Sequence, residues 1–309
     1  MKITNRIKSQ KYTVPNETRD RLGRLADRKI YGKLLVELLP VVADIYGLRA
    51  ADRSLLLALG GWLAREIKNG IRTIAEATLA LSDLRDSATQ TLLDDLFVTT
   101  TSFFRHRAQY RVAVEVFDRV FGTDEPGAEK RIWVPACSSG NEAYSLAMIL
   151  ARNGYDKKFK VEILGTDIVE TMIEVGRLGR YYYLDDRVDK DMDTGTDELI
   201  AEFGRFFVRD AADHLSTYVS NDIRRMVDFK LDNLLWTQVE GKFDVISCHE
   251  LFLHLEPSAR QVAAEVLLER LRPGGYLLTN GRIFEQMSDR LEVAANPENL
   301  QYYSYRRIS

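Results

Sequence analysis

The sequence predicts an α/β protein whose sheet-forming half follows an all-helical domain. From about Lys33 to Phe121 apolar residues recur at helical spacing without any strand signal. After a turn-rich segment at 122–130, short β-branched runs alternate with helical patterns, which is typical of a parallel sheet with helices on both faces. The length of 309 residues also favours two domains.

The first 121 residues divide into a basic arm and a helical domain at 30–121. The arm, residues 1–29, holds nine Lys/Arg against three acids, and we expect a solvated tail, although it could bind an acidic partner. Pro40 is expected to kink or divide the apolar segment 34–42. A helix ending near Asn69-Gly70 carries an apolar stripe made of Leu55, Leu59, Trp62, Leu63 and Ile67.

The domain at 131–309 is expected to hold the sheet. Its predicted strands are 131–137, 161–167, 226–233, 243–248 and 276–280, and its predicted helices are 142–153, 169–178 and 257–271. The segment at about 181–225 interrupts the alternation and predicts a small antiparallel β insertion. The alternating residues 301–308 predict an edge strand.

Composition excludes several classes of protein. Hydrophobic residues make up 45% and charged residues 29%, as in ordinary globular proteins, and a net charge of −3 argues against nucleic-acid binding. The longest apolar stretch, 55–64, is too short to cross a bilayer, and the amino terminus lacks the apolar core of a signal peptide. Two cysteines form no disulfide framework, so we expect a cytoplasmic protein.

Polar or small residues follow four predicted strands, at the edge where open α/β sheets bind ligands. The first strand runs into a small-residue turn that contains Gly140 and starts a helix, and the second ends at Asp167, which could accept both ribose hydroxyls of a nucleoside. Either feature alone could be a helix cap. The third strand ends at Asn233, suited to an adenine edge, and the fourth at Cys248-His249-Glu250. Together they favour a nucleoside cofactor.

The histidines after the fourth strand do not form a zinc-protease motif. His249 and His254 are five residues apart, whereas that motif needs a spacing of four on one helical face. Cys137 and Cys248 end two strands expected to be neighbours and are interpreted as small buried thiols. We expect no metal site.

Three stretches of the chain resemble the CheR-type methyltransferases, which esterify glutamate side chains of bacterial chemoreceptors. The first stretch is Thr99-Thr-Thr-Ser-Phe-Phe-Arg105, and the second is Ala136-Cys-Ser-Ser-Gly-Asn-Glu-Ala-Tyr-Ser145. The third is Phe243-Asp-Val-Ile-Ser-Cys248 together with Leu271-Arg-Pro-Gly-Gly275. The order and size of the helical domain and of the insertion also match, from about residue 30 onward.

The resemblance implies a class I methyltransferase Rossmann-like sheet that binds S-adenosylmethionine and releases S-adenosylhomocysteine. The cofactor contacts that it implies are Thr99, Thr101, Arg105, Glu142, Asp167 and Asn233, to which the strand ends add Gly140, Cys248 and His249. Arg105 would come from the helical domain and close over the methionine end of the cofactor. We also count Arg105 among the catalytic residues, with His249, Glu250 and His254.

The acceptor site departs from the family. The family has Arg-Asn where this chain has His249-Glu250, usually has a tyrosine where His254 stands, and has Asn at Thr99. An ionised Glu250 would repel a carboxylate acceptor, and a histidine could deprotonate a hydroxyl or ammonium group.

Three hypotheses follow from these departures. The preferred one is methyl transfer to an oxygen or nitrogen of a small molecule or peptide outside chemotaxis. The alternatives are a chemoreceptor protein-glutamate methyltransferase and a SAM-binding regulatory protein without turnover. The partner is accordingly a small-molecule, peptide or protein acceptor, without nucleic acid and without membrane insertion.

Overall fold

The computed structural model describes residues 28–97, 99–122, 124–182, 202–281, 284, 287, 289–295 and 302–308. Most of the predicted basic arm, residues 1–27, lies outside the described residues. The chain forms two compact units, one of residues 1–98 and 254–262, and one of residues 99–253 and 263–309. The predicted domain boundaries at 29, 121 and 130 remain predictions.

The first unit is built from helices. Its elements are α3 (Arg28–Tyr46), α4 (Arg53–Asn69), α5 (Ile74–Ser82) and α6 (Ser87–Leu96). The Asp52 side chain caps α4 by accepting the Ser54 N–H, and Gly70 ends the helix at φ 116°. Four members of the predicted stripe, Leu55, Leu59, Trp62 and Leu63, are buried, which confirms it.

Pro40 does not divide its helix. It lies inside the continuous α3, where it removes one backbone hydrogen bond. The neighbouring Leu38, Leu39, Val41 and Val42 are all buried. Because tertiary burial supplies most of a helix's stability, it offsets the missing bond.

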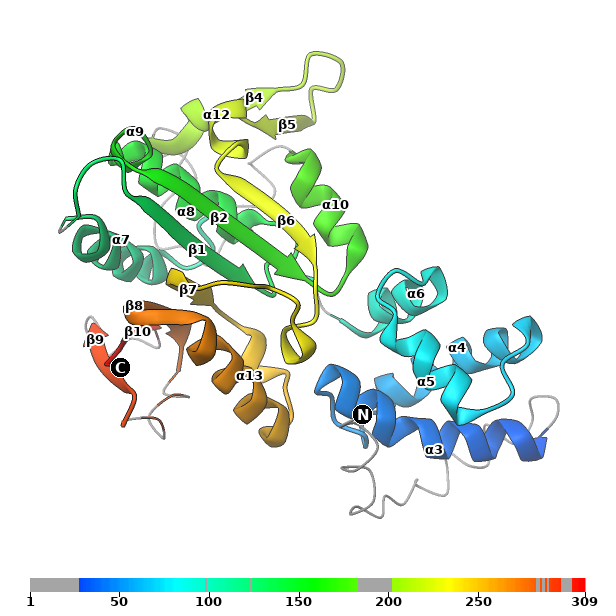
Figure 1. Ribbon diagram of the computed structural model, residues 1–309. Coiled ribbons are helices and arrows are strands. Elements are labelled where there is room, and N and C mark those ends of the chain that lie inside the picture. The colour runs from blue at the N-terminus through cyan, green and yellow to red at the C-terminus, as the bar shows by residue number, and fades with distance from the viewer. Residues whose placement is uncertain are drawn as a thin grey trace. The chain divides into compact units, whose positions relative to one another are not determined.

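The second unit holds a seven-stranded sheet in the order β6-β2-β1-β7-β8-β10-β9 (Figure 1). The strands are β1 (Glu129–Pro135), β2 (Lys160–Asp167), β6 (Val227–Leu231), β7 (Phe243–Cys248), β8 (Leu271–Asn280), β9 (Leu291–Ala295) and β10 (Tyr302–Arg307). The first five in this order run parallel, as predicted, whereas β10 is antiparallel to both of its neighbours. The sheet is therefore a mixed Rossmann-like sheet.

The prediction of an edge strand at 301–308 was wrong. β10 lies between β8 and β9, and β9 forms the edge. The chain passes from β9 to β10 through a short connection, at 296–301. A parallel neighbour needs a crossover of a dozen or more residues, so β10 pairs antiparallel with β9. The sequence pattern had not revealed β9.

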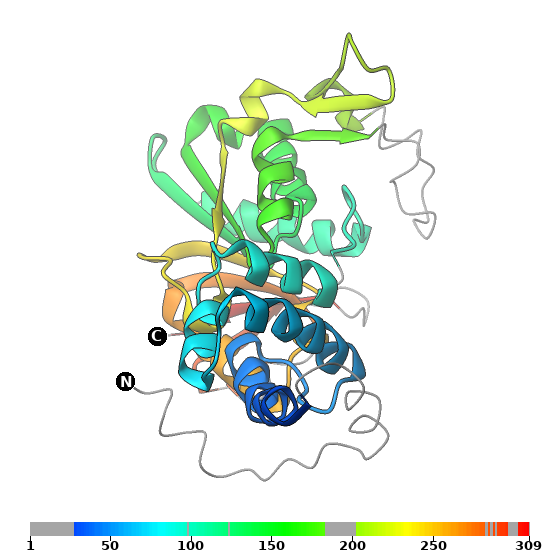
Figure 2. The ribbon, with the colours of Figure 1, turned by 90° about the vertical axis from the view of Figure 1, so that its right-hand side faces the viewer.

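The predicted insertion is present as a second, three-stranded antiparallel sheet. It consists of β3 (Arg180–Tyr182), β4 (Phe207–Arg209) and β5 (Ser216–Val219), in the order β3-β5-β4. Figures 1 and 2 show this small sheet beside α12 (Asn221–Arg224), near the point where β6 begins.

Helices connect the strands of the second unit. They are α7 (Arg107–Phe121), α8 (Asn141–Arg152), α9 (Tyr155–Lys158), α10 (Glu170–Leu178) and α13 (Pro257–Arg270), with short turns η2 (Gly204–Phe206), η3 (Leu234–Trp236) and η4 (Leu251–Leu253). Helix α13 is shared, because residues up to Val262 group with the helical unit.

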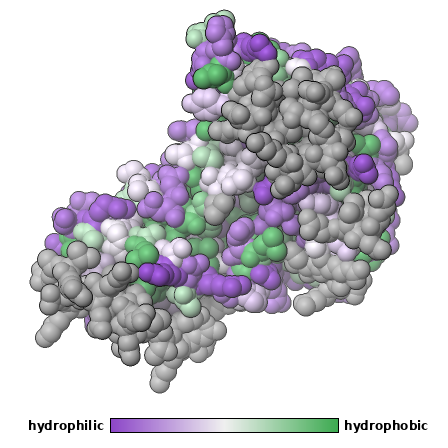
Figure 3. Space-filling view, turned by 180° about the vertical axis from the view of Figure 1, so that it is seen from behind, coloured by the Kyte–Doolittle hydropathy of each residue, from purple (hydrophilic) through white to green (hydrophobic). Residues whose placement is uncertain are grey.

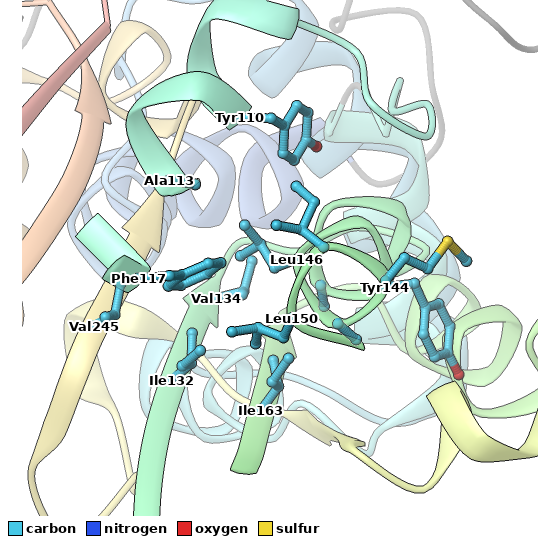
Figure 4. Packing of buried hydrophobic residues seen from close by; sticks show 14 of the residues in the cluster. Tyr110, Ala113, Phe117, Ile132, Val134, Tyr144, Leu146, Leu150, Ile163 and Val245 are labelled. Carbon is cyan, nitrogen blue, oxygen red and sulfur yellow. The ribbon is translucent and has the colours of Figure 1, made fainter. Parts of the chain in front are cut away.

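Helix α7 packs on the sheet, although its sequence was assigned to the helical domain. Figure 4 shows Ala113 and Phe117 of α7 beside Val134 of β1 and Val245 of β7, and all four are fully buried. Periodicity shows that a helix has an apolar face, but not which surface that face covers. The second unit therefore begins at Thr99.

Helices do not cover both faces of the sheet throughout. A groove of about 510 Å³ runs over β1, β2 and β6, and Arg131, Glu162 and Asp228 are among its lining residues. No helix lines this groove among the described residues. None of the described helices is long and apolar enough to span a membrane. Figure 3 shows hydrophilic residues spread over one face of the molecule, with smaller hydrophobic groups between them.

Candidate functional site

The turn after β1 is tied to the end of β2. Three of its residues have a positive φ, namely Ala136 (54°), Ser138 (50°) and Gly140 (84°). The Cys137 N–H donates to the carbonyl of Thr166 at 3.0 Å, and the Ser138 N–H donates to Asp167 Oδ2 at 2.8 Å. The turn lies where the strand order reverses between β1 and β7, which is the ligand-binding position of such sheets.

Asp167 both holds this turn and remains partly exposed. Its Oδ2 accepts the Ser138 N–H at 2.8 Å, and its Oδ1 accepts the Val169 N–H at 3.0 Å, next to the start of α10. Burial raises the pKa of the Asp167 carboxyl, and the hydrogen bonds from backbone amides oppose that shift. Each carboxylate oxygen has a second acceptor position. The backbone hydrogen bonds that Asp167 accepts are thus compatible with binding of hydroxyl groups.

Both side-chain packing and backbone conformation require a glycine at position 140. A Cβ atom at Gly140 would lie 2.5 Å from Cζ of Phe229, and Cβ atoms at Gly165 and Gly176 would lie 2.8 and 3.0 Å from the same ring. The ring of Phe229, on β6, is buried against these three glycines. Gly140 itself is buried, so close packing under the turn accounts for it without a ligand.

Glu142 and His249 form a buried polar pair. Nδ1 of His249 lies 2.9 Å from Oε1 of Glu142, and the Ser247 hydroxyl donates to the same oxygen at 2.6 Å. The His249 side chain is only 3% exposed, whereas that of Glu142 is 18% exposed. The structure therefore brings together two predicted residues, and adds Ser247, which the sequence did not single out.

The segment with the Phe-Phe-Arg motif is bonded to the sheet unit. The Ser138 hydroxyl donates to the carbonyl of Thr99 at 2.8 Å, and the Phe104 N–H donates to the Ser145 hydroxyl on α8 at 3.1 Å. Arg105 is half-buried, and its Nη1 donates to the carbonyl of Thr100 at 3.1 Å. Arg105 was expected to come from the helical domain, but it belongs to the same unit as the strand ends.

Glu250 is held by Asn280 at the end of β8. The Glu250 N–H donates to Asn280 Oδ1 at 3.0 Å, and Asn280 Nδ2 donates to Glu250 Oε1 at 3.0 Å. Nε2 of His106 lies 3.8 Å from the same Glu250 oxygen. The Tyr302 ring lies 5.4 Å from the ring of His106 and 6.0 Å from that of His249.

Sequence reasoning missed three residues of this group. Asn280, His106 and Tyr302 were not among the predicted site residues. Asn280 could have been found by the rule applied to the other strands, because it is the polar residue at the carboxyl end of the fifth predicted strand.

The remaining predicted site residues are Asn233, Thr101, His254 and Cys248. Asn233 is partly exposed, and its Oδ1 accepts the Leu235 N–H at 3.0 Å. Thr101 is half-buried, and His254 is exposed and belongs to the helical unit. Cys248 is fully buried, and burial raises the pKa of its thiol and that of Cys137. Both cysteines are free thiols, as interpreted from the sequence.

The polar groups at this edge fit S-adenosylmethionine. Asp167 offers acceptors for ribose hydroxyls, Glu142 offers an acceptor for an ammonium group, and Arg105 offers donors for a carboxylate. All three side chains are partly exposed. A carboxylate and a guanidinium group are thus both available for the two ends of the amino-acid part of the cofactor, and their contacts with it remain predictions.

Comparison with known proteins identifies a family and several relatives. The family model described as CheR methyltransferase, SAM binding domain, matches residues 99–297. A chemotaxis protein methyltransferase of Vibrio parahaemolyticus is 30% identical over 214 residues, which cover 66% of this chain and 72% of the relative. Chemotaxis protein methyltransferase 1 of Vibrio cholerae is 30% identical over 224 residues, covering 70% and 74%. Among solved structures, the N-methyltransferase NodS from Bradyrhizobium japonicum with S-adenosylhomocysteine aligns with a TM-score of 0.36 at 11% identity, covering 65% of this chain and 88% of that chain.

Proposed function

Because the chain belongs to the CheR methyltransferase family and is a SAM-dependent methyltransferase, we propose that its acceptor is a side-chain carboxylate of a protein. The named relatives are chemotaxis protein methyltransferases, which supports a protein acceptor. This proposal reverses the order of the sequence-based hypotheses, which preferred a small-molecule or peptide acceptor outside chemotaxis. The family match also favours an enzyme over a SAM-binding regulatory protein without turnover.

The burial of His249 carries the proposal. Its side chain is 3% exposed and its Nδ1 faces Glu142, so it is poorly placed to take a proton from an acceptor. A carboxylate acceptor needs no base, because it is already ionised near neutral pH. One of its oxygens forms the new O–CH₃ bond as the S–CH₃ bond breaks, which yields a methyl ester and S-adenosylhomocysteine.

The charge of Glu250 is a weaker objection to this acceptor than the sequence suggested. Its carboxylate accepts a hydrogen bond from Asn280 and lies 3.8 Å from Nε2 of His106. These contacts reduce the repulsion that an isolated carboxylate would exert. The residues of this chain then mainly orient the acceptor and exclude water.

The proposal is tested with a chemoreceptor cytoplasmic fragment and methyl-labelled S-adenosylmethionine. We expect label that alkali releases as methanol, which identifies a methyl ester. We also expect a rate without a rising limb at about pH 6–7, where an unperturbed imidazole titrates. Label that resists alkali would contradict a carboxylate acceptor.

A second candidate is transfer to an ionisable O–H or N–H of a small molecule or peptide. The pairing of His106 with Glu250 favours it, since a carboxylate can orient a histidine that acts as a base. His254, which is exposed, remains a further predicted base. Substituting His254→Phe or His106→Phe should then abolish a rising limb at about pH 6–7, whereas ester formation should be unaffected.

We further propose a cytoplasmic location. The two free, buried thiols of Cys137 and Cys248 support it, because a reducing compartment keeps thiols unpaired.

A further inference from the structure

Glu250 is a carboxylate outside the predicted cofactor contacts, and two hydrogen bonds with one residue hold it. Asn280 bonds both its main chain and its side chain, each at 3.0 Å. Asn280 is 7% exposed and ends β8, which lies between β7 and β10. A buried amide on an internal strand has few alternative positions, so it fixes the direction of the Glu250 carboxylate.

The backbone of Glu250 is strained. Its φ is 61°, in the left-handed region that favours glycine and asparagine over longer side chains. The hydrogen bond from the Glu250 N–H to Asn280 stabilises this conformation. Strained backbone conformations that the surrounding structure maintains are found most often at functional sites, where they set the direction of a side chain.

Glu250 also lies away from the nucleoside end of the predicted cofactor site. In the sheet, β2 with Asp167 is followed by β1, β7 and β8, so Asp167 and Asn280 are three strand spacings apart, about 14 Å. Glu142 lies in the first turn of α8, which follows β1, and His249 directly follows β7, so each follows one of the two strands between these ends. Along the strand order, Glu250, which is bonded to Asn280, therefore follows the residues expected to contact the amino-acid part of the cofactor.

One oxygen of Glu250 remains for a ligand. Oε1 accepts the hydrogen bond from Asn280, whereas Oε2 has no hydrogen bond to any of the described residues. The side chain is 32% exposed. An oriented, exposed carboxylate oxygen accepts hydrogen bonds from ammonium, guanidinium or amide groups, whereas an acidic neighbour of the methylated group would offer it no donor.

We propose that Glu250, positioned by Asn280, is a specificity-determining residue that binds a hydrogen-bond donor beside the methylated group of the acceptor. The inference rests on the proposed function, methyl transfer to a protein side chain. It specifies the acceptor further: the glutamate that is methylated has a lysine, arginine or glutamine as neighbour rather than another acid. Asn280 is a positioning residue, because it acts through Glu250.

Short peptides test this inference with the full-length enzyme. Each peptide carries one glutamate with Lys, Gln, Ala or Glu beside it, and alkali-labile methyl transfer is measured with wild type, Glu250→Gln, Asn280→Ala and the control Glu174→Gln. Glu174 is an exposed residue of α10, remote from β8 in the sheet order. We expect wild type and the control to prefer Lys over Glu as neighbour by about tenfold or more in kcat/KM, as for a charge-assisted hydrogen bond.

The variants should lose this preference in a defined way. In Glu250→Gln the preference should fall below about threefold, mainly through KM, while affinity for S-adenosylhomocysteine stays the same. Asn280→Ala should lose the preference although Glu250 is present, and a thermal shift with S-adenosylhomocysteine shows whether this variant is folded. An unchanged ranking of peptides in Glu250→Gln overturns the inference and leaves the proposed function intact.

A binding measurement separates the two proposals. If no peptide becomes a methyl ester, the same peptides, fluorescently labelled, are titrated with enzyme and S-adenosylhomocysteine. A Lys-over-Glu preference that wild type shows and Glu250→Gln lacks supports the inference while the carboxylate acceptor fails. No preference in either turnover or binding overturns the inference.

Discussion

Replacing Asp167 by Asn should weaken both the fold and cofactor binding. The substitution keeps the shape of the side chain but places an NH₂ group opposite one of two backbone donors, Ser138 N–H at 2.8 Å or Val169 N–H at 3.0 Å. Leaving one buried donor unsatisfied costs about 1–3 kcal/mol. For a unit of this size, each kcal/mol lowers Tm by about 2–4 °C.

Affinity for S-adenosylhomocysteine should fall as well. If Asp167 accepts ribose hydroxyls through its remaining acceptor positions, Asp167→Asn or Asp167→Ala loses bonds worth about 1–3 kcal/mol, a factor of roughly 5 to 150 in Kd. Titration calorimetry measures this factor, and thermal unfolding measures the loss of stability.

The pH dependence of stability adds an independent check. Burial raises the pKa of Asp167 above the ordinary carboxyl value of 3.8, so the folded state keeps this proton at pH values where the unfolded chain has released it. Stability that depends on Asp167 is therefore present below pH 3.8 and is lost as the pH rises through the raised pKa. Urea unfolding from pH 4 upward should show a shallower decline in Asp167→Asn than in wild type.

Asp244 provides the matched control, because it makes comparable hydrogen bonds at the amino end of a strand, away from the carboxyl ends where the cofactor is expected. Its carboxylate accepts the Arg131 N–H at 2.8 Å and pairs with Arg272 at 2.7 Å, at the start of β7. Asp244→Asn should lower Tm and leave Kd for S-adenosylhomocysteine unchanged. A Kd for Asp167→Asn within twofold of wild type would refute the role of Asp167 in cofactor binding, even if Tm falls.

Three further predictions concern the same unit. Gly140→Ala should destabilise the protein by about 2–4 kcal/mol in urea unfolding, because φ is 84° and the new Cβ meets Phe229 at 2.5 Å, and Phe229→Leu should restore part of the loss. Arg105→Ala should raise Kd for S-adenosylhomocysteine about tenfold in calorimetry with little change in Tm, since its side chain is half-buried; an unchanged Kd would contradict the contact. A fragment that starts at Thr99 should fold and bind S-adenosylhomocysteine. A fragment that starts at Glu129 should bind it poorly, because that fragment lacks α7. Equal affinity of the two fragments would contradict this prediction.

Local sequence patterns determined the secondary structure and the nature of the site. The stripe of α4 and the turn at Gly70 identified that helix, and the β-branched runs identified the five parallel strands. Polar residues at strand ends identified Asp167 and Asn233 as candidates, and the motifs around Arg105 and Glu142 identified the family. These features can be predicted from sequence because helices and strands each have a characteristic period of apolar residues, and turns favour particular residue types.

Only the tertiary structure decided which of these residues meet. Asn280 and Glu250 are 30 residues apart, and His249 and Glu142 are 107 apart, so no local pattern records their pairing. The burial of His249 changed the preferred acceptor, although its sequence position had suggested a base. The packing of α7 on the sheet and the internal position of β10 were decided in the same way. Each depends on strand order and on which apolar faces cover each other, and residue periodicity is the same whichever partner is chosen.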